Sequence, residues 1–301
     1  MITIIEAQRF PAGPTATSVL AAPLDLEASP RSVGPFAVVV HYRMAASPPG
    51  ALPVDADVRP HPHVGLAAIS CVIEGAITHR DSLGSRCELG AGDIGVTVAG
   101  RGVVHSERFE RIRLLGGALD LFQLLLALPD GAEDVEPSFV RRPSGEMPIS
   151  GGAGATTRWL LPAPPELPAA LPMTTPILLA DVTLDRGAAW SLPDVPERAV
   201  YVWAGEVEVG GTVARAGHVA VIGPGDVEAR ALEPTRLLAF GGAPVGPRYS
   251  WWNYLHSSLE RIEAARAEWR QGRVELPPGD TESFTPAPPD DGRPLRLLNA
   301  R

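Results

Sequence analysis

The sequence predicts an all-β protein made of two tandem barrels of one type, with a single helix near the C-terminus. The first observation behind this prediction is a series of short runs rich in Val, Ile and Leu, separated by Gly, Pro and Asp at intervals of roughly 8 to 12 residues. Such spacing is typical of antiparallel sandwiches and barrels. These runs lie at 36–44, 66–75, 93–100 and 119–129 in the first half, and at 177–184, 199–211, 218–223 and 235–242 in the second.

The second observation is that the two halves look like copies of each other. Cys71 begins the sequence CVIEGAI and Tyr201 begins YVWAGEV, while Ala91 begins AGDI and Ala216 begins AGHV. A strand, a tight Gly turn, a second strand and an AG turn therefore recur in the same order, and we predict two barrels of one type.

A stretch rich in Pro and Gly, over about 141–172, separates the two halves and indicates a linker or an interdomain crossing. We therefore predict three parts of the chain. They are a first barrel over 1–145, a linker or crossing over 146–172, and a second barrel with a helix and a tail over 173–301.

The predicted helix follows the second barrel. The sequence SSLE at 257–260 has the form of a capping box, and Leu259, Ile262 and Trp269 lie on one stripe of a helix. Gly272 stands where a C-terminal glycine is expected. We expect this helix to pack across a barrel.

Composition limits what the protein can do. The chain has 301 residues, 45% of them hydrophobic, and a formal net charge of -9, which argues against direct nucleic-acid binding because phosphate contacts need a basic face. The apolar run Leu124–Pro129 is far shorter than the roughly 20 residues that cross a bilayer. The first residues lack the pattern of a secretory signal, so we expect a cytoplasmic protein without membrane association.

Two short windows carry residues with metal-binding chemistry. They read RPHPHVG at 59–65 and GVVHSER at 102–108. Residues i and i+2 of a strand project from the same face, so His61 can act with His63, and His105 with Glu107. Three imidazoles and a carboxylate suit Fe(II), Zn, Ni, Cu or Mn, and the lack of a thiolate favours an open, catalytic type of site.

Each window also has an ordinary explanation. An HxH pair in a Pro-rich loop is often a surface feature, and HSE can be a turn with a solvated glutamate. The two windows fall in one predicted barrel, which favours a shared metal site. In the second half, the repeat places Ser191, Pro193, Arg230 and Leu232 at the equivalent positions, so we predict that the second barrel binds no metal.

Residues 59–108 resemble the pirin family of the cupin superfamily. The likeness lies in HPHxG, the EGxxxHRDSLG hairpin, the GD turn and AGRGVVHSER, and residues 251–269 are similar to one bacterial pirin subgroup. The resemblance implies two cupin barrels of the double-stranded β-helix or jelly-roll type. It also implies one metal in the N-terminal barrel, usually iron, and the four ligands His61, His63, His105 and Glu107.

The resemblance further implies a metal-dependent dioxygenase, since several pirins are similar in activity to quercetin 2,3-dioxygenases. Glu107 would then serve as ligand and as general base during ring cleavage of a flavonol or related polyphenol, a small aromatic substrate. The alternative is an iron-bearing, redox-responsive regulatory protein that binds a protein partner without turnover.

Three positions depart from the family pattern. Val96 and Thr97 follow the GD turn where relatives carry an aromatic residue and a methionine, and Leu125 stands near Gln123 where relatives have a tryptophan. If these positions face the site, aromatic stacking worth about 0.5 to 1.5 kcal/mol per pair is lost. We therefore expect the metal ligands to be kept and a flavonol to be held less tightly.

Overall fold

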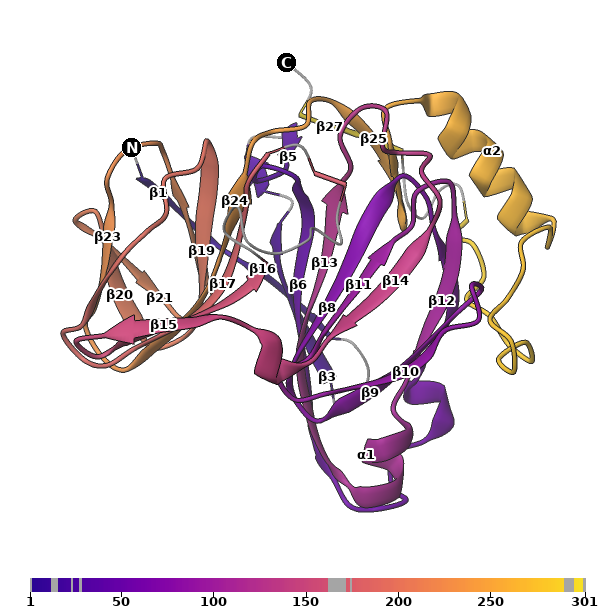
Figure 1. Cartoon of the computed structure of the whole chain (residues 1–301), viewed down its shortest axis with the longest axis horizontal. Coiled ribbons are helices and arrows are strands. Elements are labelled where there is room, and N and C mark those ends of the chain that lie inside the picture. The colour runs from indigo at the N-terminus through magenta and orange to yellow at the C-terminus, as the bar shows by residue number, and fades with distance from the viewer. Residues whose placement is uncertain are drawn as a thin grey trace.

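The protein forms two β-rich lobes side by side, seen in the computed structural model of Figure 1. The structure describes residues 2–11, 16–22, 24–26, 29–161, 172–173, 175–289 and 295–299. Each lobe consists of a seven-stranded and a four-stranded antiparallel sheet. The prediction of an all-β protein with two barrels is therefore confirmed.

The first barrel carries both histidine windows on its smaller sheet. Its larger sheet has the order β14 (Ser138–Arg142), β11 (Ile94–Val98), β8 (Leu66–Glu74), β13 (Gly117–Ala127), β6 (Phe36–Ser47), β3 (Ala16–Ala22) and β2 (Gln8–Pro11). Its smaller sheet has the order β10 (Arg86–Gly90), β9 (Ala76–Asp81), β12 (Val103–Arg108) and β7 (Val58–His63).

The second barrel repeats this arrangement. Its larger sheet has the order β1 (Ile2–Glu6), β22 (His218–Ile222), β19 (Glu197–Ala204), β24 (Thr235–Gly242), β17 (Ile177–Leu184), β16 (Ala155–Leu161) and β15 (Ile149–Gly152). Its smaller sheet has the order β18 (Ala189–Ser191), β23 (Glu228–Ala231), β20 (Glu206–Val209) and β21 (Thr212–Arg215).

Two segments belong to the second barrel although the sequence analysis assigned them to the first barrel or to the linker. β1 opens the chain, yet it pairs with β22 of the second barrel, with Ile2 opposite Ile222. β15 and β16 lie within the predicted linker and continue the second barrel's sheet through β17. Local composition could not show the pairing of β1, because its partner β22 is distant in sequence. β15 and β16 instead form a local hairpin within a stretch whose Pro and Gly content indicated a linker. The boundaries at 145 and 172 stay predictions about independent folding units.

The remaining elements are short and mostly surround the first barrel. They are the helices α1 (Glu110–Leu115) and α2 (Leu259–Arg270), the 3₁₀ turns η1 (Val54–Ala56) and η2 (Ser144–Glu146), and the strands β4 (Leu24–Leu26), β5 (Ser29–Arg31), β25 (Arg248–Trp251), β26 (Tyr254–His256) and β27 (Arg296–Leu298). Among the described residues, neither helix has the length and apolar character to cross a membrane.

The predicted helix is present as α2, which lies beside the first barrel (Figure 1). Its N-cap is Ser258, whose hydroxyl accepts a hydrogen bond from the Arg261 amide, so the predicted capping box was wrong by one residue. Ser257 binds the buried Glu133 of the first barrel instead. Gly272 does follow the helix in the left-handed conformation, with φ of 64°.

Only part of the predicted apolar stripe of α2 is buried. Ile262 and Trp269 are buried, whereas Leu259 is 38% exposed. Ile262 packs with Tyr254 of β26 and with Val64, the residue that follows His63. The helix therefore supports the strand that carries the first histidine window.

The two barrels share an apolar core. It includes Ile69 and Phe122 from the first barrel and Tyr201 and Phe240 from the second. His41 lies buried in this interface, 2.7 Å from a carboxylate oxygen of Asp120 and 3.2 Å from the hydroxyl of Tyr201. The barrels therefore meet through a shared apolar core, and His41 adds buried polar contacts with Asp120 and Tyr201.

The glycine of the HPHxG motif has a structural role. Gly65 has φ of +75°, and a Cβ atom there would lie 2.0 Å from the Leu255 carbonyl oxygen. Substitution by a larger residue would force apart the contact between the first window and the β26 segment. The Gly65 position therefore lets the chain after the second barrel lie directly against the first.

We expect Gly65→Ala to destabilise the protein more than Gly84→Ala does. Gly84 has φ of +90° but nothing within 4 Å of a Cβ atom, so it provides a control with backbone strain and no clash. Left-handed strain alone costs about 1 to 2 kcal/mol, and the clash at Gly65 adds to it. Urea unfolding of both variants measures the difference, and equal losses would contradict this account.

Candidate metal centre

The three histidines of the two windows lie on neighbouring strands that face the barrel interior. β7 is the edge strand of the smaller sheet, where Pro60 and Pro62 are tolerated because an edge strand does not need every N–H group. Between these prolines, His61 stands opposite His105 of β12. All three imidazoles are buried.

The imidazoles converge through their Nε2 atoms. His105 Nε2 lies 2.9 Å from His61 Nε2 and 2.9 Å from His63 Nε2. The ligand atoms of His61, His63 and His105 lie within 4.8 Å of one another, and among the described residues they form the one group of this kind. The structure thus brings together three of the four predicted ligands.

Hydrogen bonds to carbonyl oxygens fix the tautomers of two rings. His61 Nδ1 is 2.9 Å from the Arg59 carbonyl, and His63 Nδ1 is 3.2 Å from the Asn253 carbonyl. A carbonyl only accepts, so each Nδ1 carries the proton and each Nε2 presents a lone pair. Both lone pairs point at His105 Nε2, which can donate to one of them at most.

A cation fits this arrangement better than a proton does. Two nitrogens that bind one ion at about 2.1 Å and at right angles stand about 3.0 Å apart, close to the observed spacing. His105 Nδ1 is buried and has no hydrogen-bond partner among the described residues. The three-histidine group can therefore hold a metal ion.

Burial also favours the uncharged form of two of these imidazoles, those of His63 and His105. It lowers the pKa of His63 well below its usual range, and the neighbouring His61 lowers it further. Burial, followed by His61 and His63, likewise lowers the pKa of His105. Neutral imidazole is the form that binds metals.

We expect the metal-free protein to lose stability in mild acid. In the unfolded chain His63 and His105 titrate near about pH 6.5. Their pKa values in the folded protein are lower, so the unfolded state binds more protons in mild acid. The contribution of these two neutral imidazoles to the free energy of unfolding is fully present above about pH 6.5 and falls as the pH drops below it. Urea unfolding at pH 8 and pH 5.5 measures this change. A His63→Gln, His105→Gln variant should lose less stability between the two pH values. A loss equal to that of the wild type would show that other groups cause the acid sensitivity.

Glu107 reaches the same interior but contacts a different residue. It is buried on β12, two places after His105, and its Oε1 accepts a hydrogen bond of 2.9 Å from Gln123 Nε2 on β13. The Ser70 hydroxyl donates in turn to Gln123 Oε1 over 3.4 Å. The Glu107 carboxylate is not among the converging ligand atoms, so its role as a ligand stays a prediction.

Sequence reasoning missed the residues that support the site. Asn253 holds His63 from 190 positions away, and Gln123 holds Glu107 from across the barrel. Gln123 interrupts the apolar run 121–128, and a polar residue inside a buried strand could have indicated a role in the site. No local pattern pointed to Asn253, because it acts through its backbone carbonyl.

A fourth buried imidazole adjoins the group. His79 stacks on Phe139 with ring centroids 3.8 Å apart, and its centroid lies 5.3 Å from that of His105. His79 Nε2 is 3.0 Å from Asp81 Oδ2, and Asp81 Oδ1 accepts from the Leu83 and Ser85 amides in the following turn. His79 therefore links the hairpin turn to the wall beside His105.

The three departures from the family pattern do not all face the site. Val96 packs in the core between the barrels, so its side chain points away from the histidines. Thr97 lies opposite Ala68 and Phe139, and Leu125 also lies opposite Ala68, so these side chains share the inner face. The expected loss of aromatic contact therefore concerns Thr97 and Leu125 only.

The second barrel has an apolar interior. Val182, Val200, Val207 and Leu237 pack there with Trp190. Of the four equivalent positions, Ser191 and Arg230 are exposed, and none of the four is a histidine or carboxylate. The metal-free state of the second barrel stays a prediction.

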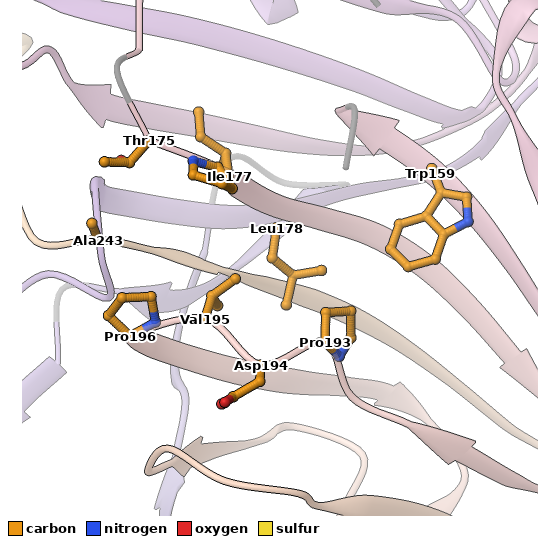
Figure 2. Close-up of a pocket in the computed structure, with 10 residues that line it drawn as sticks. Trp159, Thr175, Ile177, Leu178, Pro193, Asp194, Val195, Pro196 and Ala243 are labelled. Carbon is orange, nitrogen blue, oxygen red and sulfur yellow. The ribbon is translucent and has the colours of Figure 1, made fainter. Parts of the chain in front are cut away.

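A separate pocket of about 330 Å³ opens beside this interior (Figure 2). Trp159, Ile177, Leu178 and Val195 contribute apolar surface to it. Its one carboxylate, Asp194, accepts a hydrogen bond from the Gly225 amide. The pocket therefore differs in chemistry from the histidine group.

Two antiparallel barrels, one of them with a buried three-histidine group, define a two-domain cupin protein with a candidate metal centre. Residues 18–126 match the family model for pirin, and residues 179–275 match the model for the pirin C-terminal cupin domain. A pirin-like protein of Caulobacter vibrioides is 41% identical over 261 residues, which cover 86% of this chain and 90% of the relative. The chain belongs to the pirin family.

Other relatives carry a functional name. The Pseudomonas aeruginosa protein named "Putative quercetin 2,3-dioxygenase PA1205" is 31% identical over 80% of this chain and 76% of its own length. A crystal structure of quercetin 2,3-dioxygenase from Acinetobacter baumannii has a TM-score of 0.83 at 24% identity, covering 96% of this chain and 95% of that one. The bacterial pirin YhhW from Escherichia coli, in complex with nickel(II), has a TM-score of 0.62 at 18% identity, covering 81% of this chain and 100% of that one.

Proposed function

We propose that this pirin is a metal-dependent dioxygenase that cleaves the ring of a small polyphenol of the flavonol type. The observation that carries the proposal is the convergence of three buried Nε2 atoms in the barrel that also buries the Glu107 carboxylate. The names of the Pseudomonas and Acinetobacter proteins support the reaction type. We propose Fe(II) as the ion, with Zn, Ni, Cu and Mn suited to the same donors.

The ion would bind His61, His63 and His105, and we propose Glu107 as a fourth ligand. The metal ion would act there as a Lewis acid on the substrate hydroxyl and increase the acidity of that hydroxyl. Glu107 would take the hydroxyl proton, while Gln123 and Ser70 hold the carboxylate in place. The deprotonated substrate takes up one dioxygen molecule and releases one carbon monoxide, which balances the ring cleavage.

The inner face opposite the histidines offers little aromatic surface to a substrate. Thr97 and Leu125 provide no ring for stacking, but Phe139 remains beside His79. We therefore expect weak discrimination among flavonols.

Oxygen uptake by the iron-loaded protein tests the proposal. Anaerobically loaded protein is mixed with a flavonol in aerated buffer, and dioxygen consumption and carbon monoxide release are followed together. We expect the iron-loaded protein to release one carbon monoxide for each dioxygen consumed, and the metal-free protein to consume no dioxygen and release no carbon monoxide. Metal-loaded protein that shows no turnover with any flavonol would overturn the proposal and favour the redox-responsive regulatory protein.

A further inference from the structure

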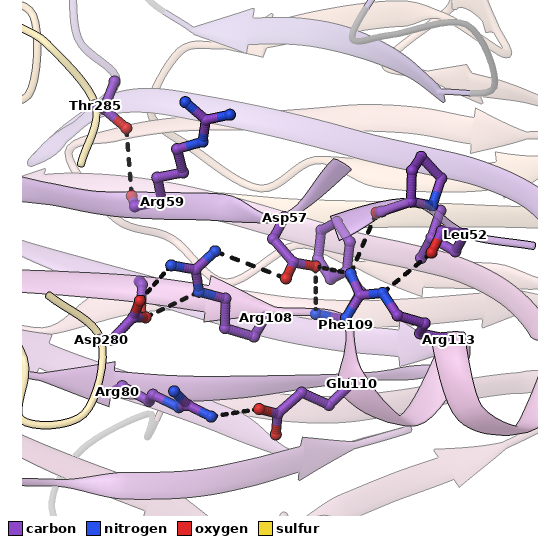
Figure 3. Close-up of polar contacts among 12 residues, drawn as sticks. Leu52, Asp57, Arg59, Arg80, Arg108, Phe109, Glu110, Arg113, Asp280 and Thr285 are labelled. Atoms are coloured by element: carbon purple, nitrogen blue, oxygen red, sulfur yellow. Dashed lines mark hydrogen bonds and ion pairs between the residues drawn. The ribbon is translucent and has the colours of Figure 1, made fainter. Parts of the chain in front are cut away.

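The chain after α2 returns across the outer face of the smaller sheet of the first barrel. We call residues 277–289 the tail segment. Its residue Thr285 is linked to α2 through the Trp269 indole, which donates to the Thr285 carbonyl over 3.1 Å. The tail segment then contacts three neighbouring strands, β9, β12 and β7, and Figure 3 shows several of these contacts.

On β12, the side chains that alternate with the metal-site residues point outward to the tail segment. Ser106 and Arg108 flank Glu107, and both are buried. Ser106 Oγ donates to Asp280 Oδ2 over 2.6 Å, and Arg108 Nε donates to the same oxygen over 2.8 Å. Arg108 Nη2 binds the other carboxylate oxygen, which completes a bidentate pair.

On β7, the tail segment binds at a β-bulge. The register between β7 and β12 shifts between His105 and Glu107, which places the irregularity at Arg59 and Pro60. The Thr285 amide donates to the Pro60 carbonyl over 2.8 Å, and its hydroxyl donates to the Arg59 carbonyl over 3.3 Å. The Arg59 carbonyl is the same atom that accepts from His61 Nδ1.

On β9, Arg80 Nη1 donates to the Gly279 carbonyl over 3.2 Å, next to Asp280.

Arg108 also faces a second carboxylate, Asp57, at 3.7 Å, and Asp57 pairs with Arg113 (Figure 3). Asp280 is 8% exposed, so its ion pair with Arg108 is largely shielded from water.

We infer that Asp280 and Thr285 are positioning residues that clamp β12 to β7 from outside and thereby hold the imidazoles at metal-binding spacing. Asp280 fixes the residues on either side of Glu107, and Thr285 fixes the carbonyl that orients His61. Loss of either contact should let the two strands separate more easily and release the ion faster. This inference rests on the metal centre of the proposed function.

Cobalt release by the full-length protein tests the clamp. Protein loaded with Co²⁺ is mixed with excess EDTA, and the loss of the cobalt absorption bands is timed for wild type, Asp280→Asn and Thr285→Val. Residues that orient metal ligands typically change metal affinity by about 10 to 100-fold, so we expect release at least about 10-fold faster in Asp280→Asn. Thr285→Val keeps its backbone contact, and we expect a smaller increase together with shifted absorption bands.

Glu282→Gln is the matched control, because it makes the same chemical change on an exposed residue of the tail segment. It should release cobalt at the wild-type rate. Unfolding midpoints of the metal-free variants separate a general loss of stability from an effect on the site. Wild-type release rates in both Asp280→Asn and Thr285→Val, whatever their midpoints, would overturn the clamp alone. A wild-type protein that takes up no cobalt would overturn the metal centre and the clamp with it.

Discussion

Wild-type protein purified without chelator and without a tag is expected to contain close to one metal ion per chain, and the His61→Ala, His63→Ala variant very little. The substitutions remove two of the three imidazoles whose Nε2 atoms converge. Only His105 and the proposed ligand Glu107 remain, and we expect these two donors to lose the ion during purification. Elemental analysis of both proteins measures the content and identifies the metal.

His218→Ala provides the control for this comparison. His218 also lies on a strand, but in the second barrel, where its Nδ1 accepts a hydrogen bond from the Arg215 amide. Its removal should leave the metal content unchanged. Equal metal in wild type and the double variant would show that any ion binds elsewhere.

Glu107→Gln is expected to abolish most oxygen uptake while the ion stays bound. Glutamine has the shape of glutamate, and its carbonyl oxygen can accept the hydrogen bond from Gln123, but it cannot take a proton from the substrate. Loss of a general base typically lowers the rate by about 10² to 10⁴-fold. The three imidazoles remain, so elemental analysis should still find metal.

Glu88→Gln makes the same substitution at an exposed position of β10, where Glu88 pairs with Arg111. It should consume oxygen at the wild-type rate. If Glu107→Gln also turns over normally, the proton passes to another group. If it loses its metal instead, Glu107 contributes mainly as a ligand.

The fold was largely predictable because barrel strands leave local traces in a sequence. Short apolar runs, Gly turns and the internal repeat predicted two barrels, and the Ser–Glu and Gly signals predicted α2. The capping residue was wrong by one position, since Ser257 and Ser258 are adjacent and only the contact of Ser257 with Glu133 distinguishes them. That contact joins residues 124 positions apart, which local patterns do not show.

The three-histidine group was predictable for a similar reason. Strand periodicity places His61 and His63 on one face, and the second window, in the same predicted barrel, adds His105. The contacts that hold the group come from Asn253, Asp280 and Thr285, which lie far along the chain. Sequence periodicity therefore identified the donors, while their orientation depends on tertiary contacts that no short window contains.

The position of β1 links residues that precede the first barrel to a sheet of the second barrel. Ile2 pairs with Ile222, so β1 has no partner until β22, which lies far along the chain, has also been made. Until the two strands pair, β1 and any edge of β22 already made present unpaired backbone groups, which are prone to join strands of other molecules. During synthesis the first barrel can form around its own sheets, but the larger sheet of the second barrel is complete only when β1 pairs with β22.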